Sequence, residues 1–142
     1  MAKRSTRPNR QAGKGVEKVL GELELEIMQI IWARQRVTVR EVLEALTEKR
    51  PLAYTTVMTV MTRLVDKGIL RQHRQDRTYE YEAVYTPEEL TTKAVGQTIR
   101  SLLESFGPLA VTEFIHQIGQ VDPDELQRLA KLAQEATEHD SL

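Results

Sequence analysis

Hydroxyl and basic side chains follow one another between residues 50 and 77 in a pattern suited to binding a polyanion. Thr55, Thr56 and Thr59 offer short hydroxyl and methyl groups that can donate, accept or make apolar contacts with a closely approaching surface. This stretch also holds six Lys and Arg against two acidic residues. Since cations bind phosphates and such small side chains suit a DNA major groove, the stretch predicts nucleic-acid binding. A solvated surface with scattered charges is the alternative.

The segment that must position these threonines is "AYTTVMTVMTRLVDKGIL", residues 53–70. Six of the eight residues 55–62 are β-branched, which favours a strand, yet neither face would be apolar at a period of two. At a period of 3.6, four apolar residues share one face and four polar residues the other: Val57, Val60, Met61 and Leu64 against Thr55, Thr59, Thr62 and Asp66. The sequence predicts a helix, because burying four apolar side chains at about 1.5–3 kcal/mol each exceeds a propensity cost of roughly 2–4 kcal/mol. Gly68 suits a left-handed C-cap.

The flanking sequence places this helix third in a winged helix-turn-helix. Apolar spacing predicts a helix over residues 21–33, and Thr38 is placed to cap a second helix that starts near Val39. After the third helix, residues 69–74 and 78–84 are predicted to be strands of a hairpin. The expected fold is therefore mainly α, with three helices and a wing of two or three strands, followed by a helical C-terminal region.

In a winged helix the third helix enters the major groove and the wing lies beside the phosphates. The residues expected to face base edges are Thr55, Thr56, Met58 and Thr59. The residues expected to contact phosphates are Arg63, Lys67, Arg71, Arg74 and Arg77.

The chain beyond Tyr85 is predicted to be helical and to pair with a second copy. "TPEEL" offers Thr86 as an N-cap, followed by Pro87 at the first helical position. "DPDEL" repeats this helix-start signal at Asp122. The apolar residues expected to form the dimer interface are Val95, Ile99, Leu102, Phe106, Phe114, Ile118, Leu126 and Leu129. Because residues 86–142 carry more apolar surface than so small a bundle can bury, a symmetric homodimer is expected.

Charge is distributed unevenly along the 142 residues. Residues 1–85 hold 16 Lys and Arg against 11 Asp and Glu, whereas residues 86–142 hold 4 against 10. We expect a flexible basic N-terminal tail over residues 1–16, a DNA-binding domain over 17–85 and a dimerisation domain over 86–142. A chance distribution of charge is the alternative.

Composition limits the classes of function. There is no cysteine, so thiol chemistry and disulfides are excluded, and no apolar run is long enough to cross a bilayer. His73, His116 and His139 lie far apart, and no phosphate loop, nucleophile elbow or paired-carboxylate motif is present. We therefore expect no enzyme activity, metal, cofactor or membrane insertion, and a cytoplasmic location.

Several stretches together resemble the penicillinase-repressor family (BlaI/MecI/CopY): "LGELELEIMQIIW", "VREVLEAL", "AYTTVMTVMTRLVDKGIL" and "YEYEAV". The resemblance runs from about Leu20 to Ala136. It is most specific in the third helix, at Thr56, Thr59, Arg63, Leu64, Lys67 and Gly68. It implies a bacterial transcriptional repressor, a homodimer that sits on a palindromic double-stranded operator. A winged helix that binds another protein and no DNA is the alternative function.

The resemblance also implies ways in which the repressor is released from DNA. The copper branch senses metal through a cysteine-rich motif, so copper is not expected as an inducer of this cysteine-free chain. In the antibiotic-resistance branch, a membrane sensor triggers cleavage between Asn and Phe. The corresponding bond here joins Glu113 and Phe114, which makes it a candidate release site and a sensor-linked protease a candidate partner. A dimer-core role for Phe114 is the favoured alternative.

Overall fold

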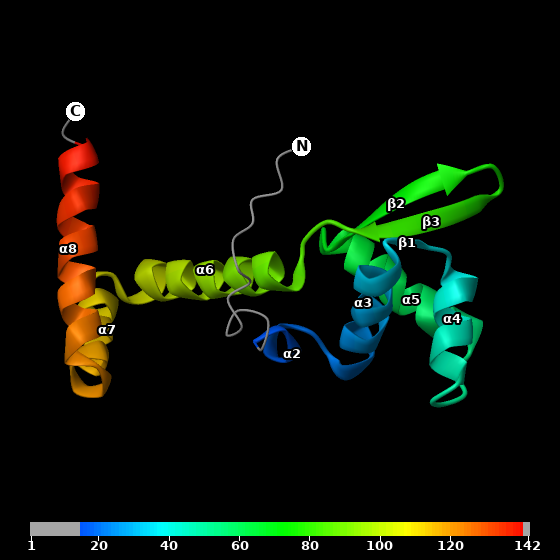
Figure 1. The fold of residues 1–142 in the computed structure, drawn as a ribbon, viewed down its shortest axis with the longest axis horizontal. Helices are drawn as coiled ribbons and strands as arrows, with labels where there is room; N and C mark the ends of the chain where they lie inside the picture. The colour runs from blue at the N-terminus through cyan, green and yellow to red at the C-terminus, as the bar shows by residue number, and fades with distance from the viewer. Residues whose placement is uncertain (1–14, 141–142) are drawn as a thin grey trace. The chain divides into compact units, whose positions relative to one another are not determined.

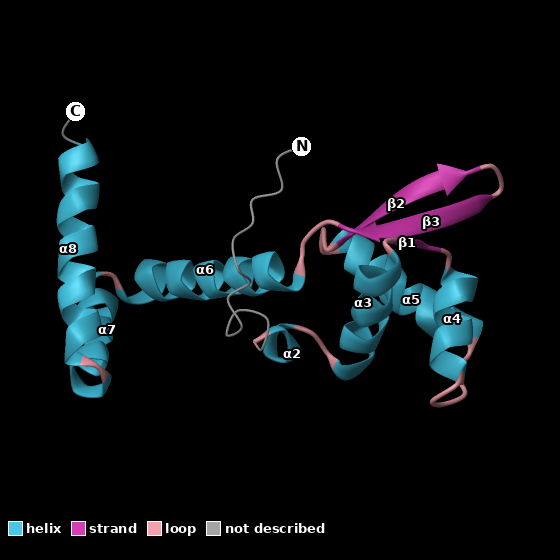
Figure 2. Cartoon of the chain, viewed as in Figure 1, coloured by secondary structure: helices cyan, strands magenta, loops and turns pink. Residues whose placement is uncertain are grey.

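The structure is a computed structural model that describes residues 15–140 (Figures 1 and 2). Its elements are α2 (Val16–Val19), α3 (Glu22–Arg34), β1 (Arg36–Val37), α4 (Val39–Thr47), α5 (Tyr54–Asp66), β2 (Leu70–Gln75), β3 (Thr78–Ala83), α6 (Pro87–Phe106), α7 (Pro108–Val121) and α8 (Pro123–Asp140). By their internal contacts they form two compact units, one ending at Val95 and the other starting at Gly96, and each is described by itself. The predicted domain boundary between residues 85 and 86 stays a prediction.

The first unit is a winged helix, as predicted. Its antiparallel sheet has the strand order β1-β3-β2, so the wing has three strands. The two-residue turn between β2 and β3 places Asp76 at φ 54°, a conformation that Asp tolerates better than most residues. β1 pairs Val37 with Tyr81 of β3, which joins the connection between α3 and α4 to the hairpin.

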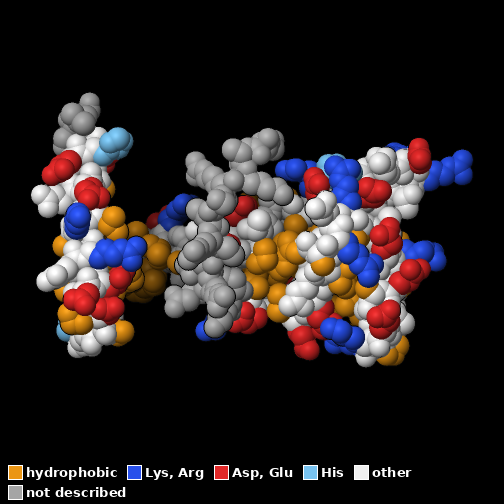
Figure 3. All heavy atoms as spheres, viewed as in Figure 1, with side chains coloured by type: hydrophobic (Ala, Val, Ile, Leu, Met, Phe, Trp, Pro, Cys, Tyr) orange, Lys and Arg blue, Asp and Glu red, His pale blue; other side chains and the backbone are white. Residues whose placement is uncertain are grey.

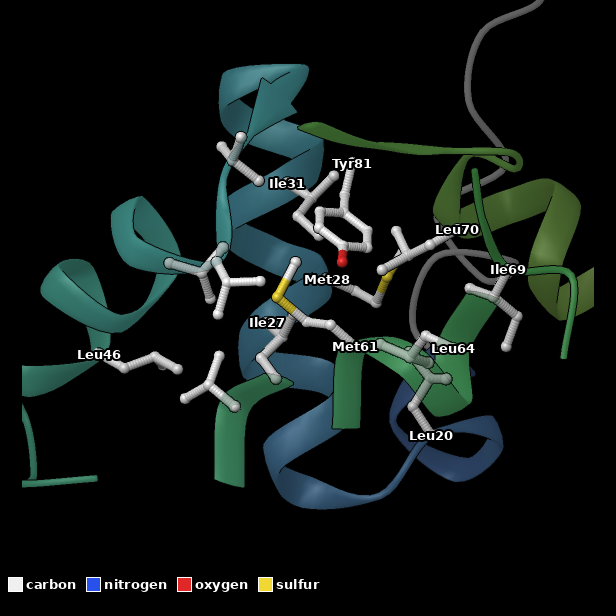
Figure 4. Close-up of a cluster of buried hydrophobic side chains, with 14 of the residues drawn as sticks. Leu20, Ile27, Met28, Ile31, Leu46, Met61, Leu64, Ile69, Leu70 and Tyr81 are labelled. Atoms are coloured by element: carbon white, nitrogen blue, oxygen red, sulfur yellow. The ribbon is translucent and has the colours of Figure 1, made fainter. Parts of the chain in front are cut away.

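The core of this unit lies between α3, α4, α5 and the sheet (Figure 4). Ile27, Met28 and Ile31 of α3 are fully buried, and they meet Met61 of α5 and Tyr81 of β3 in one cluster. The tyrosine hydroxyl is not left without a partner in this cluster, because the amide of Gln72 donates to it over 3.3 Å. Burial raises the pKa of Tyr81, so this phenol stays neutral at physiological pH.

Residues 54–66 form α5, which confirms the helix predicted from the apolar period. Val57, Met61 and Leu64 are fully buried, and Val60 packs against the same core. The threonines of the opposite face are exposed, as expected. Tertiary packing therefore stabilises a helix built largely from β-branched residues.

Gly68 ends α5 in the left-handed conformation that its sequence position predicts, at φ 77°. Its N–H donates to Val65 O and the N–H of Ile69 donates to Leu64 O, each over 2.9 Å. These two bonds are those of a Schellman motif, and they satisfy carbonyl groups that the last helical turn would otherwise leave free.

Side-chain caps start three helices at the predicted residues. Thr38 Oγ1 accepts from Glu41 N at the start of α4, and Thr86 Oγ1 accepts from Glu89 N at the start of α6. Asp122 Oδ1 accepts from the N–H groups of the first turn of α8. Each cap satisfies donors that lack a partner within the helix.

The structure differs from the sequence analysis at the N-terminal end of the described chain. Residues 1–14, which form most of the predicted basic tail, lie outside the described residues. Val16, the last residue of that predicted tail, begins α2, and its side chain is buried together with that of Leu20. The low apolar content of the preceding residues conceals this small helix in the sequence.

The second unit is an open arrangement of helices. α7 packs against α8 closely enough that a Cβ added to Gly119 would lie 3.3 Å from a methyl group of Leu126. Neither α7 nor α8 buries any side chain completely. This unit therefore leaves much of its apolar surface in contact with solvent.

Replacing Gly68 by Ala is expected to lower the free energy of unfolding of the first unit by about 1–2 kcal/mol, because a Cβ is disfavoured in the left-handed conformation. A Cβ at this position would meet no atom within 4 Å, so packing contributes nothing to the loss. Gly68→Asn is the matched control and should cost less, since Asn tolerates this conformation. Urea denaturation measures both; equal losses for Ala and Asn would contradict the backbone explanation.

Candidate functional site

The exposed face of α5 carries all four residues that were predicted to face base edges: Thr55, Thr56, Met58 and Thr59. At 100° per residue, Thr59 points almost directly away from the buried face, while Thr56 and Met58 lie on its two flanks. Tyr54, one turn before Met58, is 44% exposed on the same flank. The structure thus extends the predicted surface by an aromatic side chain.

Two threonine hydroxyls on this face are already engaged with the helix. Thr59 Oγ1 donates to Thr55 O over 2.7 Å, and Thr62 Oγ1 donates to Met58 O over 2.8 Å. Thr55 and Thr56 occupy the first turn, where no helical carbonyl lies four residues earlier, and their hydroxyls form no hydrogen bond with any other described residue. The second and third turns therefore offer methyl groups and acceptor lone pairs, whereas the first turn can also donate.

The basic end of α5 combines one unpaired cation with one paired cation. Lys67 Nζ lies 3.0 Å from Glu24 Oε2 of α3. Burial opposes ionisation of Glu24, but the hydrogen bond from Gly21 N and the charge of Lys67 outweigh it and lower the pKa of this carboxyl. Arg63 forms no ion pair with a residue in the described part of the chain, although its charge also lowers the pKa of Glu24.

On the wing, three cationic or titratable side chains converge on one carboxylate. Arg71 Nη1 and His73 Nε2 lie 3.4 and 2.6 Å from Glu82 Oε1, and Arg36 Nε lies 3.4 Å from Glu82 Oε2. The sheet register causes this arrangement, because Arg71 and Arg36 each stand directly opposite Glu82 on its two neighbouring strands. The hydrogen bond from His73 and the nearby guanidinium of Arg36 lower the pKa of Glu82.

The outer part of the hairpin is basic and lacks such pairing. Arg74 Nε donates to the backbone carbonyl of Asp76 over 3.4 Å, and Arg77 occupies the turn itself. Neither side chain forms an ion pair within residues 15–140. Figure 3 shows a Lys or Arg side chain extending past the tip of the hairpin. All five residues predicted to contact phosphates are thus exposed, on α5, just after it, or on the hairpin.

Sequence reasoning missed some participants in this surface. Tyr54 could have been found from its spacing of four residues before Met58. Glu24 and Glu82 could not, because their pairing depends on the approach of α3 to α5 and on the strand register. These carboxylates decide which cations are paired before any ligand binds.

Five of the eight residues predicted to form a dimer interface are exposed, one at the end of the first unit and four in the second. Val95, Ile99, Leu102, Phe106 and Phe114 are each between 45% and 59% exposed. Apolar residues of α6 and α7 line a groove: Ile99, Leu102, Leu103, Ala110, Val111 and Phe114. Figure 3 shows exposed hydrophobic side chains where α6 ends and α7 begins.

The other predicted interface residues, Ile118, Leu126 and Leu129, are half-buried within one chain, where α7 packs on α8. The candidate cleavage bond between Glu113 and Phe114 lies near the middle of α7, and both residues are exposed. Among residues 15–140, no cluster of side chains is suited to hold a metal ion. No helix in this range is long and apolar enough to cross a membrane.

Comparison with known proteins identifies the family. The sequence model for the penicillinase repressor matches residues 20–135. The transcriptional regulator BlaI of Mycobacterium tuberculosis is 39% identical over 116 residues, covering 80% of this chain and 84% of that protein. The penicillinase repressor of Bacillus licheniformis is 28% identical over 120 residues, covering 82% of this chain and 90% of that protein.

A solution structure of monomeric BlaI from Bacillus licheniformis in complex with the blaP half-operator is 28% identical. The aligned region covers 47% of this chain and 82% of the BlaI chain, and the TM-score is 0.43. The family match and the first relative confirm the resemblance found in the sequence: this chain belongs to the penicillinase repressor family.

Proposed function

We propose that this protein binds a palindromic operator as a homodimer and so prevents transcription of the adjacent genes. Its family membership makes it a DNA-binding transcriptional repressor and not an enzyme. The observation that carries the finer proposal is the exposed face of α5, where Thr55, Met58 and Thr59 lie beside the unpaired cation Arg63. This combination suits a helix that enters a major groove between two phosphate backbones.

In this proposal α5 contacts base edges through Thr55, Thr56, Met58 and Thr59. The phosphates are bound by Arg63, Lys67, Arg71, Arg74 and Arg77. We assume that each subunit of the dimer neutralises roughly three to five phosphates. A plot of the logarithm of the binding constant against the logarithm of the salt concentration should then have a slope of about −5 to −9.

The ion pairs at Lys67 and Arg71 position these cations without preventing phosphate binding. Both pairs lie at the surface, where such interactions contribute about 0–1 kcal/mol to stability. A DNA phosphate can therefore replace Glu24 or Glu82 as the partner at little cost. Until it does, the carboxylates hold two long side chains at the edge of the expected DNA surface.

The apolar groove of α6 and α7 supports the homodimer. A small unit that exposes Phe106, Phe114 and several aliphatic side chains gains stability if a second copy covers them. Two copies related by a two-fold axis would present two α5 helices to successive major grooves, about one helical turn apart. An inverted repeat in the operator follows from this symmetry.

For release, we propose either cleavage of the bond between Glu113 and Phe114 by a sensor-linked protease or dimer dissociation by another route. This bond lies within a regular helix, so a protease that binds its substrate in an extended conformation would first have to unfold part of α7. The same region holds the groove proposed for dimerisation. Local unfolding there would therefore weaken the dimer and the operator complex together.

The proposal is tested by incubating purified full-length protein with genomic DNA fragments of its own organism at physiological salt and sequencing the bound fragments. Recovery of a short inverted repeat near promoters would support the operator proposal, and the adjacent genes would indicate the regulated pathway. Recovery of no sequence above background by a folded dimer would favour the protein-binding alternative.

Arg63→Ala and Thr59→Ala are expected to affect DNA binding differently. Removing Arg63 should weaken binding to operator and random DNA alike and reduce the salt slope by about 1 per subunit, because a phosphate contact carries no sequence information. Thr59→Ala should mainly reduce the ratio of operator to random affinity. Fluorescence anisotropy at several salt concentrations measures both effects. Arg128→Ala, in α8, is the control and should not change DNA binding. If all three variants lose affinity for operator and random DNA equally, the separate phosphate and base roles of Arg63 and Thr59 are contradicted.

Leu102→Glu is expected to raise the dimer dissociation constant by at least about 100-fold, because an uncompensated buried charge costs about 3–5 kcal/mol. Gln97→Glu adds the same charge to the opposite face of α6 and is the matched control. Analytical ultracentrifugation measures the dissociation constants, and circular dichroism verifies that both variants fold. Equal dimer dissociation constants for the two variants would show that the dimer interface does not include the apolar groove around Leu102.

A further inference from the structure

The exposed surface of α5 lacks the side chains that most often identify purines. Guanine is usually read by bidentate Arg or Lys, and adenine by bidentate Asn or Gln. Within Tyr54–Asp66, Arg63 is the only residue of these four types, and it comes after more than two helical turns. The residues before it that face outward offer hydroxyl, methyl, thioether and phenol groups.

The hydrogen bonds of the next two turns limit this chemistry further. Because the hydroxyl protons of Thr59 and Thr62 are donated to Thr55 O and Met58 O, these side chains have no free donor to offer a base. Each keeps its methyl group and the acceptor lone pairs of its oxygen. A donor-seeking atom such as O6 or N7 of guanine would find no partner there.

The neighbouring side chains add apolar surface to the same side. Met58 is 43% exposed, and its thioether is flexible enough to adapt to an irregular surface. Tyr54 lies one turn away on the same flank and is equally exposed. Met58 and Tyr54 therefore form an apolar strip one turn long on one flank of the helix, while Thr59 points directly away from the buried face.

A methyl group in the major groove is the base feature that this surface fits. Thymine is the only base of ordinary DNA with a C5-methyl group, and small apolar side chains, including the threonine methyl, contact it. We propose that α5 recognises thymine methyl groups in the operator and that the methyl group of Thr59 is a specificity-determining contact. This inference rests on the proposed function and concerns how the same site selects its sequence.

The test uses the inverted repeat recovered from genomic DNA, with each thymine replaced in turn by deoxyuridine. This replacement removes only the C5-methyl group and preserves base pairing. We expect at least one position in each half-site at which the full-length protein binds about fourfold more weakly, as expected for one exposed methyl contact. Binding to random DNA should not change.

Two variants separate the methyl group of Thr59 from its hydroxyl group. Thr59→Val keeps a methyl at this position and removes the hydroxyl, and it should retain the penalty for deoxyuridine. Thr59→Ser keeps the hydroxyl and removes the methyl, and it should bind the thymine and deoxyuridine operators equally at the position concerned. Both changes are on an exposed face, and circular dichroism verifies that the variants fold.

The inference is overturned if no thymine position responds to deoxyuridine, if the serine variant keeps the penalty, or if the valine variant loses it. A large loss on replacing guanine by 7-deazaguanine, without any deoxyuridine effect, would assign recognition to Arg63 instead. In these cases specific operator binding remains and the proposed function survives. If no operator is recovered at all, both proposals fail.

Discussion

Burial of one face of α5 is the constraint on which the other features of the first unit depend. Val57, Met61 and Leu64 pack against α3 and the sheet, and this contact fixes the rotation of α5 about its own axis. The rotation places Thr59 opposite the core and Met58 and Thr56 on the flanks. The residues that would meet DNA are therefore oriented by side chains that never touch it.

The sequence was sufficient to predict those features of the fold that depend on local signals. The helical period of residues 53–66 and the caps at Thr38, Gly68 and Thr86 are determined within a few residues of each position, and the structure confirms them. The clustering of cations around Glu82 depends on strand register instead. A shift of one residue would place this carboxylate on the other face of the sheet, so spacing alone could not predict it.

The apolar period of the C-terminal helices could be predicted, but the partner that covers each residue could not. Leu126 meets Gly119 within one chain, whereas Leu102 lines an exposed groove. Both residues belong to the same kind of sequence pattern, because periodicity records that a face is apolar and not which surface covers it. Within the candidate site, the exposure of the threonines was predictable from the apolar period. The direction of their hydroxyl groups was not, because it depends on the side-chain torsion that each threonine adopts in the folded helix.

The carboxylates beside Lys67 and Arg71 have a consequence for the search of a whole genome. A repressor competes for its target against an excess of about 10⁶–10⁹ unrelated sites, and every uncompensated cation strengthens all of those contacts equally. In the proposed complex, a phosphate displaces Glu24 from Lys67 and Glu82 from Arg71 wherever the protein meets DNA. Because phosphate contacts carry no sequence information, this displacement lowers the affinity for operator and unrelated DNA by the same factor. The ratio between the two affinities therefore depends on the base contacts of α5 alone.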